Sequence, residues 1–214
     1  RMKESASVVS AGAAATNWQR SGNQKLLLTC GFGGVLFVAT FVVLGILAPG
    51  YSSLHDAISA LEFTPLSLAQ RMNFFVFGLV VCGFAVALRR ELTPGRGAVL
   101  IPLFQLVAGI GLIGDAVFIH DPLHLICDLI AFNSSLAVLF LFAWRSRFES
   151  EWKSWGMYSI ATAVIMMAFL TAFGFLNPFH GPAGLMEKLA SATRTTWSVA
   201  LTIRLMAGAR FQHS

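Results

Sequence analysis

The chain has 214 residues, of which 56% are hydrophobic and only 12% are charged, and its mean hydropathy is +0.71. A soluble domain of this length needs more polar surface, so the composition argues against a soluble domain and indicates a membrane protein. The formal net charge of +5 does not indicate nucleic-acid binding, because the basic residues lie at the ends of apolar runs and are not interleaved with aromatic residues.

Six apolar segments follow one another along the chain, and about 20 helical residues are enough to cross a hydrocarbon core of about 30 Å. In chain order they cover residues 26–48, 68–88, 97–119, 122–144, 155–176 and 182–207. Asp121 and Pro122 suit the N-cap and the first position of the fourth helix. The segments predict an all-α, polytopic membrane protein whose single domain, residues 25–209, is a bundle of six transmembrane helices.

The positions of Lys and Arg predict the orientation of this bundle. If the N-terminus is cytoplasmic, only Arg71, Lys188 and Arg194 lie in the outer half, and the other twelve of the 15 basic residues lie on the cytoplasmic side. Six spans return the C-terminus to the same side. We therefore expect an N-in/C-in, multi-pass protein of the cell inner (plasma) membrane, with a flexible cytoplasmic N-terminal tail (1–24) and a short cytoplasmic C-terminal tail (210–214).

The segment 50–67 joins the first two helices and is too long for a tight turn but too polar to span. Its spacing predicts a short helix that lies on the outer membrane surface as an interfacial helix. The apolar face of this helix would consist of Leu54, Ile58 and Leu61. Its polar face would carry His55, Ser59 and Glu62.

Ionisable residues accumulate in the predicted outer half, which holds four of the five histidines and six of the ten acidic residues. The histidines are His55, His120, His124 and His180, and the acidic residues are Asp56, Glu62, Asp115, Asp121, Asp128 and Glu187. Acidic residues contribute little to the positive-inside rule, so topology does not account for this accumulation. It indicates a polar site on the non-cytoplasmic side.

Three of the charged residues, Asp115, Asp128 and Arg194, fall within the predicted hydrocarbon region. A charge there costs a few kcal/mol or more unless it is paired or hydrated. Glu187 shares a helical face with Arg194, seven residues later. We expect Arg194 to pair with Asp128 or Asp115, and these side chains to line a water-accessible cavity that opens to the outside.

The predicted cavity would bind a lipid head group or a small amphiphile, as in a binding or transport protein. Its predicted ligand-binding residues are Tyr51, His55, Arg71, Asp115, His124, Asp128, Glu187 and Arg194. The same polar residues also fit a purely structural role, in which they hold helices together in a subunit of a membrane complex. The expected partners are membrane lipids and a homo-oligomer or larger membrane complex, without nucleic acid.

A second alternative is a metal-dependent intramembrane hydrolase that acts on lipids. Its metal ligands would be His55, His120, His124 and His180, holding zinc to activate water, with an Asp as general base. The signal is weak, because the fourth helix begins between His120 and His124 and no metalloprotease glutamate accompanies them. We expect no cofactor, with zinc as the alternative, and the sequence leaves open whether the protein is an enzyme.

Three stretches resemble a family of six-helix bacterial and archaeal membrane proteins, domain of unknown function 998. They are PGYSS with AISAL (49–53 and 57–61), GDAVFIHDPLH (114–124), and Gly184-Leu185 followed by Arg194 and Trp197. The resemblance covers roughly residues 26–207, and a weaker one links the chain to the eukaryotic Frag/DRAM/Sfk six-helix proteins. The family implies a six-helix bundle and supplies no established activity or catalytic residues.

Overall fold

The computed structural model describes residues 2–119, 121–177 and 181–208, with side chains from residue 22 onward. Six α-helices form in chain order: α1 (Met2–Leu47), α2 (Ser67–Glu91), α3 (Leu100–Val117), α4 (Leu123–Ser146), α5 (Lys153–Leu176) and α6 (Ala183–Met206). Two short 3₁₀-helices accompany them, η1 (Ser59–Phe63) and η2 (Ser150–Trp152). All regular structure in the described ranges is helical, which confirms the predicted all-α class.

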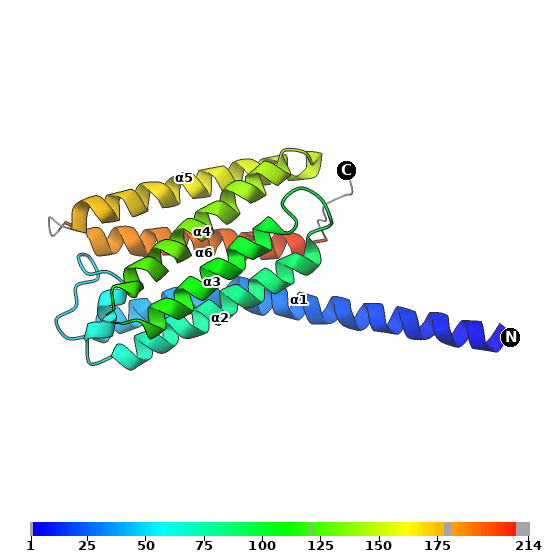
Figure 1. The fold of residues 1–214 in the computed structure, drawn as a ribbon, viewed down its shortest axis with the longest axis horizontal. Helices are drawn as coiled ribbons and strands as arrows, with labels where there is room; N and C mark the ends of the chain where they lie inside the picture. The colour runs from blue at the N-terminus through cyan, green and yellow to red at the C-terminus, as the bar shows by residue number, and fades with distance from the viewer. Residues whose placement is uncertain (1, 120, 178–180, 209–214) are drawn as a thin grey trace.

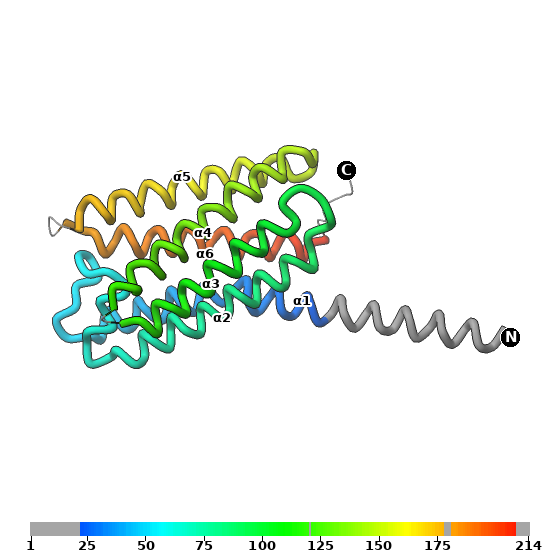
Figure 2. The backbone as a smooth tube through the Cα atoms, viewed as in Figure 1, coloured from blue at the N-terminus to red at the C-terminus, as the bar shows by residue number. Residues whose placement is uncertain are grey.

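The six helices lie side by side with their axes roughly aligned and form a single bundle, in which consecutive helices run in opposite directions (Figure 1). Each of α2 to α5 contacts the helix before and after it, and α6 closes the bundle by packing against both α5 and α1. The end of the bundle at which α2 and α6 finish is here named the proximal end (Figure 2). The opposite, distal end carries the loop 48–66 and the α3–α4 and α5–α6 connections.

Among the described residues, five helical stretches are long and apolar enough to cross a membrane. They are Gly22–Leu47, Ser67–Glu91, Leu100–Val117, Leu123–Ser146 and Ser150–Leu176. The remaining helix, α6, is less apolar because it carries Glu187, Lys188 and Arg194, all of which are buried within the bundle. The chain is thus a helical bundle of the multi-pass membrane type.

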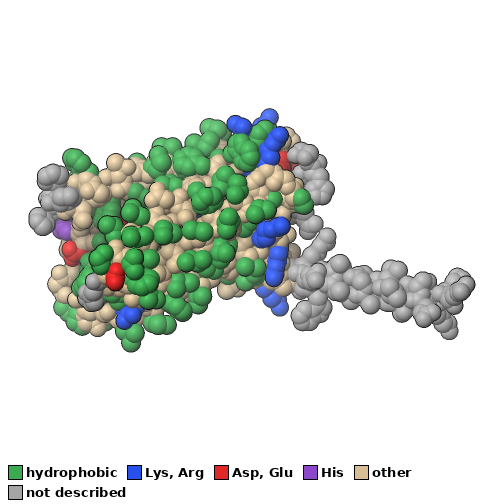
Figure 3. All heavy atoms as spheres, viewed as in Figure 1, with side chains coloured by type: hydrophobic (Ala, Val, Ile, Leu, Met, Phe, Trp, Pro, Cys, Tyr) green, Lys and Arg blue, Asp and Glu red, His purple; other side chains and the backbone are tan. Residues whose placement is uncertain are grey.

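The surface of the bundle is divided into zones along its length (Figure 3). Hydrophobic side chains cover the middle of the face shown. Many large hydrophobic side chains of the bundle are exposed, and Leu36, Leu79 and Ile110 are each at least half exposed. Lys and Arg gather at the proximal end, where Arg89 and Arg90 close α2. An apolar belt with a basic rim is the pattern expected of a protein that faces the hydrocarbon core and a head-group layer of a membrane.

The loop 48–66 does not form the predicted interfacial helix. Its only regular element is η1, and Ile58 and Leu61 are buried in a core cluster with Phe37, Phe41 and Phe74. Leu54, which belongs to the predicted apolar face, is 46% exposed, whereas Glu62, assigned to the polar face, is only 3% exposed. The prediction was wrong because it rested only on the spacing of apolar residues within the segment. In the structure the segment packs into the end of the bundle, and contacts with other helices decide which of its side chains are buried.

Hydrogen bonds from α6 hold this loop in place. The first N–H groups of a helix lack partners inside the helix. Here the N–H of Gly184 donates to the carbonyl of His55 and that of Leu185 to the carbonyl of Leu54, both at 3.1 Å. Farther along the helix, a carboxylate oxygen of Glu187 accepts from the N–H of Ile58 at 2.7 Å. The loop therefore caps α6, and α6 fixes the path of the loop.

Candidate functional site

The structure divides the predicted ligand-binding residues into three groups. Tyr51, His55 and Glu187 belong to the contact between the loop 48–66 and α6. Asp115, His124 and Asp128 come together between α3 and α4, with Arg71 bonded nearby, and are here named the carboxylate–histidine group. Arg194 lies deeper in the bundle. The predicted metal ligands His120 and His180 lie outside the described residues.

Arg194 does not pair with Asp115 or Asp128, so this prediction was wrong. Its guanidinium donates to the side-chain oxygen of Gln105 at 2.5 Å and to the hydroxyl of Ser198 at 2.6 Å. It also lies 4.6 Å from the centre of the Trp197 ring. Arg194 follows Glu187 by seven helical residues, so it lies about 10 Å farther along α6 toward the proximal end. It is therefore farther from the carboxylates at the distal end. The residue is 9% exposed, and its partners are neutral.

A cavity of about 70 Å³ lies at the centre of the bundle, with lining residues from all six helices. Its polar lining consists of Gln105, Asp128, Ser135, Glu187, Ser191, Arg194, Thr195 and Ser198. Its aromatic lining consists of Phe37, Phe74, Phe77, Phe84 and Phe132. Asp128, Glu187 and Arg194 therefore line one common space, whereas Asp115 is not among the lining residues.

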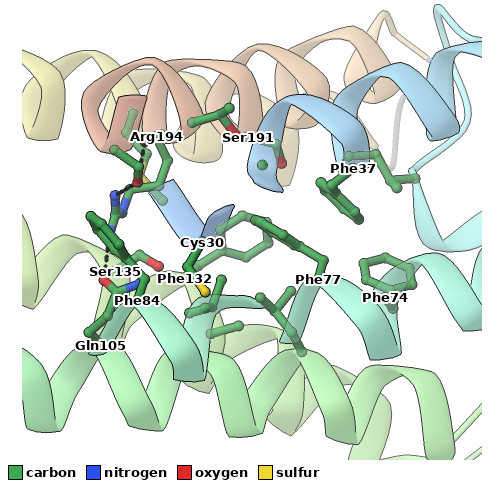
Figure 4. A pocket seen from close by; sticks show the side chains of 18 of the residues that line it. Cys30, Phe37, Phe74, Phe77, Phe84, Gln105, Phe132, Ser135, Ser191 and Arg194 are labelled. Carbon is green, nitrogen blue, oxygen red and sulfur yellow. Dashed lines mark hydrogen bonds between the residues drawn. The ribbon is translucent and has the colours of Figure 1, made fainter. Parts of the chain in front are cut away.

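Arg194 and the group of Phe37, Phe74 and Phe77 occupy different parts of the cavity, whereas Phe84 and Phe132 lie on the same side as Arg194 (Figure 4). Arg194 reaches from α6 toward Gln105 of α3, while Phe74 and Phe77 of α2 lie with Phe37 of α1 farther along, and Phe37 and Phe77 are stacked with ring centres 4.2 Å apart. The cavity is thus amphipathic, with a cation and aromatic rings in its lining.

Small residues bring α1 close to α6 beside this cavity. A Cβ at position 34 would lie 2.9 Å from the hydroxyl of Thr195, closer than a real Cβ approaches another atom, and Gly31 faces Thr202 in the same way. Close approach through glycine is a common device in membrane helix packing. It keeps the polar face of α6 turned toward the bundle interior.

The carboxylate–histidine group joins the C-terminal turn of α3 to the first turns of α4. One ligand-type atom from each of Asp115, His124 and Asp128 lies within 4.8 Å of the others. His124 Nε2 is 3.9 Å from Asp128 Oδ2, and His124 Nδ1 is 3.3 Å from the backbone carbonyl oxygen of Asp115. Asp115 is fully buried, and its carboxylate lies within hydrogen-bond reach of the Asp128 carboxyl group, while no N–H group of the described residues donates to it.

Gly111 explains how two carboxyl groups from different helices come this close. A Cβ at this position of α3 would lie 2.8 Å from the carbonyl oxygen of Cys127 and 2.9 Å from the backbone nitrogen of Ala131, both in α4. With no side chain there, the two backbones are in direct contact. Asp115, one turn later on α3, then meets Asp128 across the interface.

Two further charged residues surround the group. Arg71 of α2 donates from Nε to the carbonyl of Ala116 at 3.1 Å, where the C-terminus of α3 carries partial negative charge. Glu62 is buried, and neither of its carboxylate oxygens has a hydrogen-bond partner in the described structure. Burial raises the pKa of Glu62 to about 7; the Arg71 charge opposes this increase and the Asp128 charge adds to it.

A surface hollow of about 210 Å³ gives access to this group. Its lining consists of Glu62, Phe63, Ile119, Asp121, His124 and Leu125. His124 and Asp128 keep side-chain exposures of 20% and 23%. A dissolved ion can therefore reach the imidazole of His124 from outside, whereas the Asp115 side chain is not exposed.

The other predicted residues hold the loop to α6. The hydroxyl of Tyr51 bonds to the carbonyls of Asp56 and Ala57 at 3.2 and 3.0 Å, and burial raises its pKa. Lys188 Nζ also donates to the carbonyl of Asp56, at 2.8 Å, and lies 5.2 Å from the Tyr51 ring. His55 Nδ1 is 3.0 Å from the carbonyl of Gly181. In the described structure His55 does not join the carboxylate–histidine group.

Gln105 is the residue of the cavity that the sequence reasoning missed. It contacts Arg194 directly and is 2% exposed. The signal was present in the sequence, because Gln105 and Asp115 are the only polar side chains in α3. A lone amide inside an apolar span needs a buried partner, and that requirement points to the guanidinium.

Comparisons with known proteins identify the family of the chain. The comparison with curated proteins gave no match, and neither did the comparison with solved structures. The model of the family described as "Protein of unknown function (DUF998)" matches residues 32–204. This range contains Gln105, Arg194 and the whole carboxylate–histidine group. It covers far more than half of the chain, so the chain belongs to the DUF998 family, as its sequence resemblance predicted.

Proposed function

We propose that the central cavity binds the head group of a lipid or another small amphiphile, with an anionic group of the ligand at Arg194. One observation carries this proposal. The guanidinium of Arg194 is buried in the bundle, and its hydrogen-bond partners in the described structure are the neutral side chains of Gln105 and Ser198. Its Nε has no partner there.

A buried charge with neutral partners is costly. Removing one member of a buried ion pair typically costs about 3–5 kcal/mol, because the remaining charge is uncompensated. A ligand with a phosphate or carboxylate group supplies the missing negative charge and can bond to Nε. An arginine fork suits such planar or tetrahedral anions better than an ammonium does.

The remainder of the lining fits an amphiphile rather than a free ion. The five phenylalanines offer contacts for carbon atoms next to the head group. Asp128 and Glu187 lie in the same lining, so an amino group on the ligand would be favoured on their side. With about 70 Å³ available, roughly five water volumes of about 10–15 Å³ each, the cavity accepts a head group and leaves long acyl chains to the surrounding bilayer.

We further propose that all six helices cross the inner membrane with both termini in the cytoplasm. Support comes from the basic rim at the proximal end and from the length of α6, whose 24 residues extend about 36 Å. Fusions test the orientation. Green fluorescent protein at the C-terminus should fluoresce, and alkaline phosphatase inserted after Gly181 should be active. Phosphatase activity at the C-terminus instead would reverse the orientation.

Lipid binding is tested on the full chain purified in mild detergent. Native mass spectrometry with phosphatidylglycerol, phosphatidylethanolamine and a neutral diacylglycerol compares the wild type with Arg194→Gln. We expect the anionic and zwitterionic lipids to bind the wild type, and Arg194→Gln to weaken them by about 10- to 100-fold, since a hydrogen bond to a charged group contributes about 1.5–3 kcal/mol. Diacylglycerol should bind poorly to both.

Arg204→Gln is the matched control. Arg204 lies on the same helix but outside the cavity, where it donates to the carbonyl of Glu151 and lies near Trp152 and Trp155. This variant should bind lipid as the wild type does. Equal lipid binding by the Arg194 and Arg204 variants would refute the proposal.

A further inference from the structure

The orientation of His124 indicates where its free ring nitrogen points. A carbonyl oxygen can only accept a hydrogen bond, so the contact of 3.3 Å between Nδ1 and the Asp115 carbonyl requires the ring proton on Nδ1. In the neutral ring, Nε2 then carries a lone pair. That lone pair faces Asp128 Oδ2 at 3.9 Å. Two acceptors that face one another need a proton or a cation between them.

Asp115 adds a second acceptor to the same space. Its side chain is fully buried, and its ligand-type oxygen lies within 4.8 Å of the corresponding atoms of His124 and Asp128. Within the described ranges its carboxylate accepts no hydrogen bond from an N–H group, and it lies within hydrogen-bond reach of the Asp128 carboxyl group. Buried carboxylates are ordinarily paired or coordinate metals. The group therefore has two carboxylates and an imidazole that converge, without a lysine or an arginine among them.

We propose that Asp115, His124 and Asp128 form a binding site for one divalent transition-metal ion, with zinc as the best fit. The ligand atoms are one carboxylate oxygen from each aspartate and Nε2 of the histidine. A water molecule entering from the hollow that His124 helps to line would complete the coordination. This site shares Asp128 with the lining of the central cavity, but Arg194 is not part of it.

The donor set selects the kind of ion. Magnesium and calcium prefer oxygen ligands alone, whereas an imidazole with two carboxylates suits zinc and its neighbours in the first transition series. Zinc bonds to nitrogen and oxygen are about 2.0–2.2 Å, so tetrahedral ligand atoms lie roughly 3.4 Å apart. The 3.9 Å between His124 Nε2 and Asp128 Oδ2 is close to this spacing, and small side-chain rotations are enough to reach it.

The surroundings also match those of metal sites. Metal-bound histidines usually donate their other ring N–H to a carbonyl or carboxylate, which is the role of the Asp115 carbonyl here. The direct backbone contact at Gly111 fixes the spacing of α3 and α4, and hence of the two aspartates. The hollow of about 210 Å³ supplies an access route to His124. The His124 ring is thus oriented by a hydrogen bond, the two aspartates are held at a fixed spacing by the helix contact, and a metal ion can reach the group through the hollow.

Zinc binding is measured on the full chain in detergent after chelation with EDTA and removal of the chelator. Equilibrium dialysis against micromolar Zn²⁺, followed by elemental analysis, gives the stoichiometry. We expect one ion per wild-type chain, and affinities more than about tenfold weaker for His124→Gln and Asp128→Asn. His55→Gln is the matched control, because this distal histidine bonds to Gly181 outside the group, and it should retain wild-type binding.

A second measurement uses only the wild-type protein, so it tests the zinc site even if the variants do not fold. X-ray absorption at the zinc edge should show a first shell of nitrogen and oxygen, with the outer-shell scattering of one imidazole. A sulfur shell would overturn the proposal and point to a cysteine such as Cys127. Absence of stoichiometric zinc would also overturn it, and would mean that the two carboxyl groups are held by protons. Zinc binding by Arg194→Gln should be unchanged, which separates this result from the test of lipid binding.

Discussion

Gly184 at the start of α6 lies directly against the backbone of Asp56 in the loop 48–66. A Cβ at position 184 would overlap the carbonyl oxygen of Asp56 and lie 2.6 Å from its carbonyl carbon. Only glycine allows the N–H groups of Gly184 and Leu185 to reach the carbonyls of His55 and Leu54. This contact fixes the distal end of the bundle, the end at which the carboxylate–histidine group also lies.

The first prediction concerns this contact. Gly184→Ala should destabilise the protein by about 1–3 kcal/mol, because the added methyl group pushes the loop away from α6. The thermal unfolding midpoint in detergent measures the effect. Gly174→Ala is the control, since a Cβ at this helical position of α5 meets no atom within 4 Å, and it should leave the midpoint unchanged or raise it slightly. Equal midpoints for both variants would contradict the close contact.

The second prediction separates the acceptor of Glu187 from its charge. Glu187→Ala removes the acceptor of the buried N–H of Ile58 and should cost about 1–3 kcal/mol of stability. Glu187→Gln keeps an oxygen in the same place and should recover most of the loss. Thermal unfolding of the three proteins checks the order. If Glu187→Gln unfolds as easily as the alanine variant, the charge rather than the hydrogen bond supports the loop.

The third prediction is a pH dependence from Glu62. Burial raises its pKa from 4.5 to about 7, so the folded protein binds a proton that the unfolded chain releases. The groups that act on it are Arg71, which lowers this pKa, Asp128, which raises it, and Asp115, which interacts with it. Stability should therefore fall as pH rises from about 4.5 to about 7, by up to a few kcal/mol, and level off above.

Thermal unfolding in the presence of EDTA between pH 4.5 and 8 tests this sign. Glu62→Gln should flatten the decrease over that range, because an amide does not titrate. A variant that keeps the full wild-type slope would assign the dependence to another group.

The fourth prediction concerns the contact between α3 and α4. Gly111→Ala places a methyl group against the backbone of Cys127 and Ala131 and should separate the two helices. Both stability and zinc affinity should fall, the stability by about 1–3 kcal/mol. Thermal unfolding and zinc dialysis on the same samples check both effects. Loss of stability with unchanged zinc affinity would show that the aspartates do not depend on this helix contact.

Local features of the chain were predictable because their physical causes are local. Apolar runs of about 20 residues predicted the helices. Asp121 lies directly before α4, where its Oδ1 accepts from the N–H of Leu123 at 2.8 Å, although the N-cap is Pro122 and not Asp121 as predicted. The end of α2 at Arg89 and Arg90 was equally clear. The start of α3 was placed three residues early, because Gly95 and Gly97 both have positive φ and form the turn before the helix.

Contacts between distant segments were predicted less well. The loop 48–66 has helical spacing, yet the N-terminal N–H groups of α6, about 130 residues away in sequence, compete for its carbonyls. Arg194 and Asp128 line one cavity, yet Gln105 is the partner of the guanidinium. Neither outcome follows from spacing within one segment, because each depends on the depth and rotation of a second helix.

The sequence by itself determined that this is a membrane bundle of long helices from the DUF998 family, since hydrophobic length, turn residues and basic ends act locally and leave a readable pattern. The tertiary structure decided which charges meet. Glycines at 111 and 184 let particular backbones come into contact, Gly34 makes room for the Thr195 side chain, and these contacts set the rotation of each helix. That rotation joins Asp115, His124 and Asp128 in one group and leaves Arg194 among neutral partners.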